Sequence, residues 1–221
     1  MFIKKQFITD RREPFFLLAK KYITPDSKVL DIGSGDDLFA STLSRDDIYM
    51  LDGNPESVNI LKQKYQNCTL GELPNLPYPD NFFDLVHSSH IVEHLTPEIL
   101  YKSLREMDRC LKSGGHLIIS APVLWQEFYD DLSHLKPYNP KVFLKYMSMG
   151  LNLSCTRPLV SDRYKLVEFA KRYSTKPFET KKINIYSEAI TFVISFFRKI
   201  IHVMGFRELE ISGYTIILRK D

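Results

Sequence analysis

A glycine turn between an apolar segment and a helix-like segment is the part of the sequence best suited to hold a ligand. Val29–Ile32 predicts a short buried strand, Gly33 and Gly35 follow it, and helical spacing then resumes. Glycine lets the backbone approach a ligand closely, and a helix N-terminus offers unpaired amides. A second predicted strand, Ile48–Leu51, ends at Asp52. An acid about 20 residues beyond the first glycine is placed to accept two ribose hydroxyls.

Three ordered blocks of the chain resemble the class I S-adenosylmethionine-dependent methyltransferases. Residues 29–35, Val-Leu-Asp-Ile-Gly-Ser-Gly, resemble motif I of that family. Residues 76–95 resemble its fourth-strand region, and residues 104–119 resemble the helix, glycine turn and fifth strand that follow. Asp37 departs from the pattern, because many members carry a third glycine at this position.

The resemblance implies that S-adenosylmethionine is the cofactor. Gly33 and Gly35 would let the backbone pass its methionine end, and Asp52 would bind the ribose. Asp31 has two open roles, since its carboxylate either orders the glycine loop or meets the amino group of the cofactor. The residues expected to contact the cofactor are Asp31, Gly33, Gly35, Asp52, Gly53, Asn54, Glu72, Leu73, Ser88 and His90.

The segment His90-Ile-Val-Glu-His94 also has the spacing of an inverted zinc-peptidase motif. That chemistry needs both histidines on a long helix and a further ligand downstream. Here the segment directly follows a predicted strand, and its letters fit the methyltransferase block. We therefore expect no metal site, with Glu93 and His94 forming hydrogen bonds at a helix start.

The stretch after the fifth predicted strand is expected to overhang the mouth of the site. Asp131, His134, Pro137 and Tyr138 resemble a pattern, Asp-x-x-His-x-x-Pro-Tyr, of bacterial methyltransferases associated with sugar and surface-polysaccharide synthesis. A sugar hydroxyl is a poor nucleophile at neutral pH, and a histidine with a pKa of about 6.5 can take its proton. His134 is therefore the expected catalytic base, with Asp131 as its expected partner and Asp130 as the other carboxylate that could orient the ring. The alternative is that His134 only packs above the cofactor.

Composition is that of one globular domain, or of one domain with an insertion. The chain has 221 residues, 44% of them hydrophobic, and a formal net charge of +3 that demands no nucleic-acid partner. The cysteines, Cys68, Cys110 and Cys155, are widely spaced and odd in number, which favours reduced thiols in a cytoplasmic protein. We expect no transmembrane segment, and the basic N-terminus lacks the apolar core of a signal peptide.

Alternating strands and helices must position these residues. Strands are expected near residues 28–32, 48–51, 67–70, 83–88, 115–120, 151–156 and 214–218, and helices near 36–44, 55–65, 97–111 and 140–149. This alternation predicts an α/β fold with a doubly wound, Rossmann-like, mostly parallel sheet of seven strands and helices on both faces. By resemblance, the last strand runs antiparallel between the fifth and sixth strands.

Two regions stand apart from this alternation. Residues 1–27 form an N-terminal arm, whose arginines either meet the cofactor or belong to a solvated segment. Residues 28–221 form the methyltransferase domain, with a helical and basic insertion around residues 158–205. Within the insertion, residues 186–204 predict an apolar helix. Such a helix packs in the core, forms a homodimer interface or makes a peripheral membrane contact.

We expect methyl transfer to oxygen on a sugar or another small hydroxylated acceptor. Within the same class of enzyme, a quinone or acyl precursor is an alternative acceptor. RNA is a further alternative, supported only by the basic residues 158–182. A cofactor-binding module without catalysis is the alternative from another class, and Asp37 is its only support.

Overall fold

The computed structural model describes residues 3–125, 127–148, 156–177 and 207–221, together with residues 192, 193, 196, 197, 200 and 203–205. Within these residues the strands are β1 (Ile3–Ile8), β2 (Val29–Ile32), β3 (Tyr49–Asp52), β4 (Cys68–Leu70), β5 (Phe83–Ser89), β6 (Leu111–Pro122), β7 (Tyr164–Pro177) and β8 (Arg207–Lys220). The helices are α1 (Glu13–Phe16), α2 (Leu38–Leu43), α3 (Pro55–Leu61), α4 (Pro97–Cys110) and α5 (Pro140–Met147), with the short 3-10 turns η1 (Leu17–Lys21), η2 (Val92–His94) and η3 (Phe128–Asp130).

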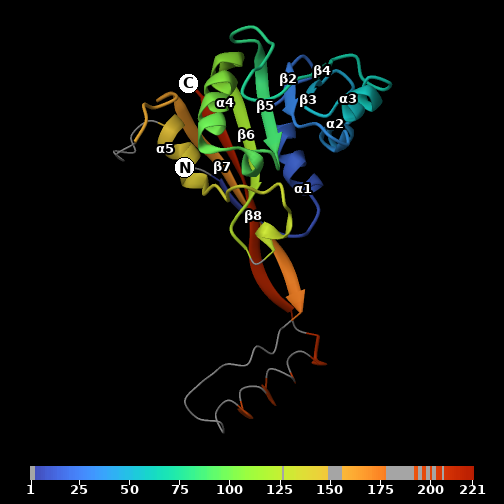
Figure 1. The fold of residues 1–221 in the computed structure, drawn as a ribbon, viewed down its shortest axis with the longest axis vertical. Coiled ribbons are helices and arrows are strands. Elements are labelled where there is room, and N and C mark those ends of the chain that lie inside the picture. Colours follow the sequence, from blue (N-terminus) through green and yellow to red (C-terminus); the bar gives the residue numbers. More distant parts are fainter. Residues whose placement is uncertain are drawn as a thin grey trace.

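All the described strands join one sheet in the order β1-β7-β8-β6-β5-β2-β3-β4 (Figure 1). Strand β8 runs antiparallel to its neighbours β6 and β7, and the other neighbours are parallel. The predicted Rossmann-like α/β fold is confirmed, with eight strands in place of seven. Strands β1 and β7 account for the difference, because they lie in the segments that the sequence assigns to the arm and the insertion. The predicted strand at 151–156 lies almost wholly outside the described residues.

The central strands are buried on both faces, as expected for a parallel sheet covered by helices. Alternate residues of β2 point to opposite layers, so Leu30 packs in one core cluster and Val29 in the other. Leu104 on α4 belongs to the first cluster, while Phe39 on α2 belongs to the second. Because every strand presents both faces to a helix layer, the loops at the carboxyl ends of the strands are the free edge where a ligand can bind.

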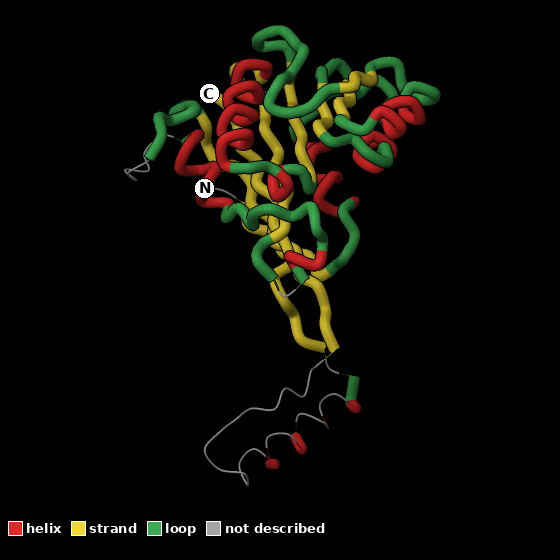
Figure 2. Tube along the Cα trace, viewed as in Figure 1, coloured by secondary structure: helices red, strands yellow, loops and turns green. Residues whose placement is uncertain are grey.

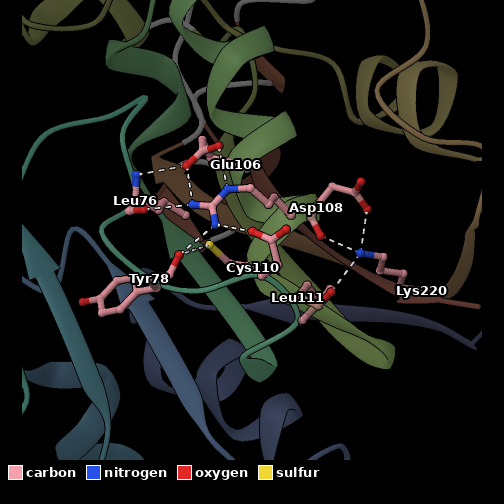
Figure 3. Close-up of polar contacts among 9 residues, drawn as sticks. Leu76, Tyr78, Glu106, Asp108, Cys110, Leu111 and Lys220 are labelled. Carbon is pink, nitrogen blue, oxygen red and sulfur yellow. Dashed lines mark hydrogen bonds and ion pairs between the residues drawn. The ribbon is translucent and has the colours of Figure 1, made fainter.

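Polar contacts tie the carboxyl end of α4 to a neighbouring loop and to β8 (Figure 3). Arg109 donates to the carbonyl oxygen of Tyr78 at 2.8 Å. Lys220, only 1% exposed, donates to the carbonyl oxygen of Leu111 at 2.8 Å and pairs with the Asp108 carboxylate at 3.0 Å. A helix end leaves carbonyl groups without partners, and Lys220 satisfies those of Asp108 and Leu111, whereas Arg109 binds the loop.

Strands β7 and β8 extend beyond the other strands as a two-stranded ribbon (Figure 2). Their pairing continues to Pro177 and Arg207. Most of the predicted apolar helix at 186–204 lies outside the described residues, although the described side chains of Phe192, Phe196 and Phe197 are exposed. No helix among the described residues is long and apolar enough to cross a membrane.

The N-terminal arm is fastened to β7 by one buried carboxylate. Glu168 has no exposed side-chain surface, and its oxygens lie 3.1 Å from the Lys5 ammonium and 2.8 Å from the Lys21 ammonium. The Tyr22 hydroxyl donates to it at 2.9 Å. Burial alone would raise the pKa of Glu168, but the hydrogen bonds from Lys21, Tyr22 and Lys5 hold that pKa below its usual value. The arm is thus part of the fold and not a solvated basic segment.

We expect Glu168→Gln to lower the free energy of unfolding at pH 7 by about 1–3 kcal/mol, because two ammonium groups lose a buried partner. A carboxyl group with a lowered pKa stabilises the fold above its unfolded pKa of about 4.3 and loses this effect as the pH falls. Urea unfolding at pH 7 and at about pH 3.5 measures this, with the exposed Glu208→Gln as the control. An equal loss at both pH values would contradict the role of the charge.

Candidate functional site

The glycine turn after β2 has the geometry that the sequence predicts. Gly33 and Gly35 have φ values of +74° and +50°, in the left-handed region that favours glycine. A Cβ atom added at Gly33 would lie 2.0 Å from Cδ1 of Ile91. The Gly33 amide donates to the Leu51 carbonyl oxygen at 2.7 Å. Only glycine therefore fits at position 33, between β3 and the segment that follows β5.

Asp52 holds the turn from the neighbouring strand. Its Oδ2 accepts the Gly35 amide at 2.8 Å, and its Oδ1 accepts the Asn54 amide at 2.8 Å. A Cβ atom at Gly53 would lie 3.3 Å from Cγ of Glu72. The structure thus brings together Asp52, Gly53, Asn54 and Glu72, four of the residues predicted for the ribose and adenine side. Their contact with a cofactor stays a prediction.

A buried pair of polar side chains lies beneath the glycine turn. Nδ1 of His87 lies 2.6 Å from Oδ1 of Asp31, and the two side chains are 2% and 4% exposed. The His87 ring stacks on Phe39 with centroids 3.8 Å apart, and its edge packs on Phe16 at 5.2 Å. Nε2 of His87 has no hydrogen-bond partner among the described residues. This contact is neither of the two roles left open for Asp31, and both stay predictions.

The sequence pattern does not predict a role for His87, although a signal is present. Its polar ring directly follows the apolar residues Leu85 and Val86 within a predicted strand. In the sheet, Asp31 and His87 are direct register partners on β2 and β5. Two ionisable residues at equal distances from the ends of adjacent central strands indicate a buried pair.

A pocket of about 310 Å³, which we term the glycine-loop pocket, opens above this pair. It is lined by Arg12, Phe16, Asp31, Gly33, Ser34, Gly35, Asp36, Leu38, Phe39, His87 and Ser89. Three of the predicted cofactor residues, Asp31, Gly33 and Gly35, line it, and Ser88 does not, because it is fully buried at the end of β5. The turn at Gly33 lets the backbone approach a ligand closely, and the unpaired Nε2 of His87 is buried beside it. These two features fit the polar methionine end of S-adenosylmethionine.

Asp37 occupies the position where the family pattern has glycine, and it adopts the glycine conformation. Its φ is +59°, and it precedes α2 without donating or accepting a side-chain cap hydrogen bond. Instead, its carboxylate accepts from the Lys64 ammonium at 3.0 Å and the Tyr65 hydroxyl at 3.2 Å. The predicted helix start at residue 36 is therefore two residues too early, because α2 begins at Leu38.

A second, narrower pocket adjoins the first, and we term it the arm pocket because α1 covers it. It is lined by Arg12, Phe15, Phe16, Ser89, His90, Ser120, Ala121, Arg172, Tyr214 and Thr215. The two pockets share Arg12, Phe16 and Ser89. The arm pocket has a volume of only about 10 Å³, which is room for about one water molecule. A larger ligand enters it only if the Arg12–Phe16 segment moves.

His90 connects the arm pocket to a buried carboxylate. Its Nε2 lies 3.1 Å from Nη1 of Arg172, and its Nδ1 lies 3.1 Å from Oε1 of Glu93. Burial lowers the pKa of His90, although Glu93 opposes that shift. Because the guanidinium can only donate, Nε2 of His90 accepts, and Nδ1–H points toward Glu93. His90 therefore faces the arm pocket, next to the site predicted for it.

The predicted catalytic pair lies close to these pockets but lines neither. Nδ1 of His134 lies 2.6 Å from the carbonyl oxygen of Phe128, and its Nε2 lies 3.8 Å from Oδ2 of Asp131. The other oxygen of Asp131 accepts from Ser133. The structure thus brings Asp131 and His134 together in one loop. A catalytic role for them stays a prediction.

Comparisons with known proteins bear on this arrangement. Residues 30–119 match the family described as Methyltransferase domain. An uncharacterized methyltransferase of Schizosaccharomyces pombe is 28% identical over 135 residues, 51% of this chain and 48% of that protein. The ubiquinone/menaquinone biosynthesis C-methyltransferase UbiE of Cupriavidus metallidurans is 26% identical over 130 residues, 52% of this chain and 53% of that protein. The chain thus spans about half the length of the curated relatives that it matches.

Solved structures match over almost the whole chain. A SAM-dependent methyltransferase from Archaeoglobus fulgidus has a TM-score of 0.58 and 24% identity, covering 95% of both chains. A methyltransferase structure from Bacillus halodurans has a TM-score of 0.61 and 14% identity, covering 93% of this chain and 96% of the other. The fold is that of S-adenosylmethionine-dependent methyltransferases. The matched domain and this fold agree with each other, since both are those of methyltransferases.

We expect Asp52→Ala to weaken S-adenosylmethionine binding by about 1.5–3 kcal/mol, or roughly tenfold to 150-fold in Kd. The variant removes both a ribose acceptor and the carboxylate that holds the Gly35 amide. Calorimetry on the folded variant measures the affinity, with the exposed Asp46→Ala as the matched control. Unchanged affinity in Asp52→Ala would remove this residue from the site.

We expect Asp37→Gly to change the free energy of unfolding by less than about 1 kcal/mol. Glycine relieves the strain of the left-handed backbone, and this gain offsets the loss of the ion pair with the exposed Lys64. Asp37→Ala should instead cost about 1–2 kcal/mol, because the strain remains while the contacts are lost. Urea unfolding of both variants provides the test, and a larger loss in Asp37→Gly than in Asp37→Ala would refute this explanation.

Proposed function

We propose that this chain is an S-adenosylmethionine-dependent methyltransferase that methylates oxygen on a small hydroxylated acceptor, such as a sugar. The observation that carries the proposal is the arm pocket. It adjoins the glycine-loop pocket through Ser89, Arg12 and Phe16. Methyl transfer is an in-line displacement, so donor and acceptor must meet in adjoining sites.

The lining of the arm pocket favours a polar acceptor over an apolar one. Hydroxyl groups come from Ser89 on β5, Ser120 on β6 and Thr215 on β8, whereas the Tyr214 hydroxyl donates to the Tyr138 carbonyl oxygen at 2.6 Å. The Ser120 and Thr215 hydroxyls lie 2.7 Å apart and are buried. A site that offers several hydrogen-bonding groups rejects ligands that leave those groups unpaired. An acceptor with its own hydroxyl groups satisfies this lining best.

The transfer also requires that the acceptor hydroxyl lose its proton and that water be excluded. S-adenosylmethionine supplies an activated methyl group when bound. His90 is the imidazole that lines the arm pocket, but its Nε2 lone pair accepts from Arg172, so it can take a proton only when that contact breaks. His134, the base predicted from the sequence, reaches the acceptor only if its loop moves. Phe15 and Phe16 close the arm pocket from the side of α1.

The UbiE relatives favour a second candidate, C-methylation of a quinone precursor, because those proteins are C-methyltransferases of ubiquinone and menaquinone biosynthesis. Their likeness reaches about half of either chain and is 26–29% in identity. A quinone ring would leave most of the polar lining unpaired, so we rank this candidate below a hydroxylated acceptor.

Radiolabelled S-adenosylmethionine offered with a panel of acceptors separates these candidates. We expect label on sugars or glycosides with free hydroxyls, and we expect little on demethylated quinol analogues. Ser120→Ala should raise the KM for the acceptor about threefold to tenfold while leaving cofactor affinity unchanged, because it removes one hydrogen bond of the lining. Label on the quinol alone would support the second candidate. Cofactor binding with no transfer to any acceptor would favour a binding module.

A further inference from the structure

Three residues that the proposed function does not use converge beside the arm pocket. Glu93 and His94 lie in η2, and His134 lies in the loop that follows η3. Each offers one ligand atom, and these atoms lie within 4.8 Å of one another. The imidazole rings of His94 and His134 have centroids 5.0 Å apart. Among the described residues, this is the cluster whose geometry suits a metal ion.

In both His94 and His134 the Nδ1 atom forms a hydrogen bond, so the Nε2 atom stays available as a ligand. Nδ1 of His94 lies 3.0 Å from the Ser133 carbonyl oxygen, and Nδ1 of His134 lies 2.6 Å from the Phe128 carbonyl oxygen. A carbonyl oxygen can only accept, so both Nδ1 atoms carry the proton. Each ring then presents an Nε2 lone pair. A metal-binding histidine usually donates its other N–H to a carbonyl or carboxylate in this way.

Glu93 brings a buried carboxyl group to the same point. Its side chain is 1% exposed, and neither carboxylate oxygen forms a hydrogen bond of good geometry among the described residues. Oε1 lies 3.1 Å from Nδ1 of His90, too poorly aligned for such a bond. A buried carboxylate without partners is costly. A cation beside Oε2 would remove that cost, with His90 as the group that orients the carboxylate.

The backbone holds the three ligands in place before any ion binds. The amides of Leu135 and Lys136 both donate to the Glu93 carbonyl oxygen, at 2.9 and 3.1 Å. The His134 amide donates to the Asp131 carbonyl oxygen at 3.1 Å. These bonds fasten the loop to η2, so little conformational freedom is lost when an ion binds.

We propose that Glu93, His94 and His134 form a binding site for a divalent transition-metal ion of the zinc type. Two imidazoles and one carboxylate are the ligands of open zinc sites, in which a fourth position stays free for water or substrate. Calcium and magnesium instead require mostly oxygen ligands. The site differs from the zinc-peptidase pattern that the sequence suggests, because His134 takes the place of His90.

The proposal concerns binding and does not depend on methyl transfer. The ion cross-links η2 to the 128–136 loop, next to the arm pocket. It also occupies Nε2 of His134, which excludes that residue from acting as a base while the ion is bound. The metal site and the catalytic base are therefore alternative roles for one lone pair, and an experiment can separate them.

The test uses the full chain without an affinity tag, treated with a chelator and then titrated with Zn²⁺ and with Co²⁺. We expect one ion per chain by calorimetry, and a visible Co²⁺ absorption band of the intensity typical of four or five ligands. A saturating ion, at about 100 times its Kd, should raise the Tm by about 5–10 °C. His94→Ala and His134→Ala should each weaken binding about tenfold or more, because each loses a ligand.

Control variants distinguish this site from adventitious binding. His116→Ala removes a half-buried histidine that packs on Tyr22, far from η2 in the sequence, and should leave the affinity unchanged. Glu93→Gln keeps the shape of a buried side chain while removing its charge, and should also weaken binding. No saturable binding, or equal binding in the native chain and His134→Ala, would overturn the proposal.

Discussion

The contact between Asp31 and His87 is the constraint on which the functional edge of the sheet depends. Both groups are buried on adjacent central strands, so neither can be left without the other at a tolerable cost. Phe39 of α2 covers one face of the His87 ring, and Phe16 of α1 covers its edge. The pair therefore fixes the glycine turn, the following helix and the covering arm at once.

The two turns that follow β2 and β5 are built against each other. Ile91 occupies the space where a side chain at position 33 would lie. His90, immediately before it, has a φ of +58°, which is unusual for a residue with a side chain. This conformation is tolerated because the surrounding contacts determine it, including the Ser120 carbonyl oxygen that accepts the His90 amide at 2.9 Å. The glycine turn thus sets the position of His90, which lines the arm pocket.

Local patterns in the sequence predict the elements that carry the glycine turn, and they fail where distant segments decide the structure. Gly33 and Asp52 follow from spacing within one strand–turn–helix unit. The sequence pattern does not predict strand β7, because Glu168 and Arg172 are charged and because a bulge between Leu166 and Glu168 breaks the alternation. Glu168 is tolerated in the sheet only because cations of the N-terminal arm reach it, and no local pattern reveals that contact.

The same limit applies to the polar residues of the site. The Asp31 and His87 pair depends on the register of two strands that lie 56 positions apart in the chain. Spacing along the sequence grouped His90 with His94 as potential ligands, because they are four positions apart. In the structure His90 turns toward Arg172, and His134, from a separate loop, takes its place beside His94.

Glu93 links the arm pocket to the cluster that it forms with His94 and His134. One of its oxygens faces His90, whose other ring nitrogen contacts the buried guanidinium of Arg172. Its backbone carbonyl accepts two amides from the loop that carries His134. A change in charge at Glu93 would act on both sides: on the hydrogen bonding of His90 in the arm pocket, and on the position of the 128–136 loop. Because this carboxylate lacks well-aligned hydrogen bonds among the described residues, it responds more strongly to a nearby cation than a fully paired carboxylate would. The arrangement therefore couples what binds beside η2 to the lining of the pocket next to the glycine turn.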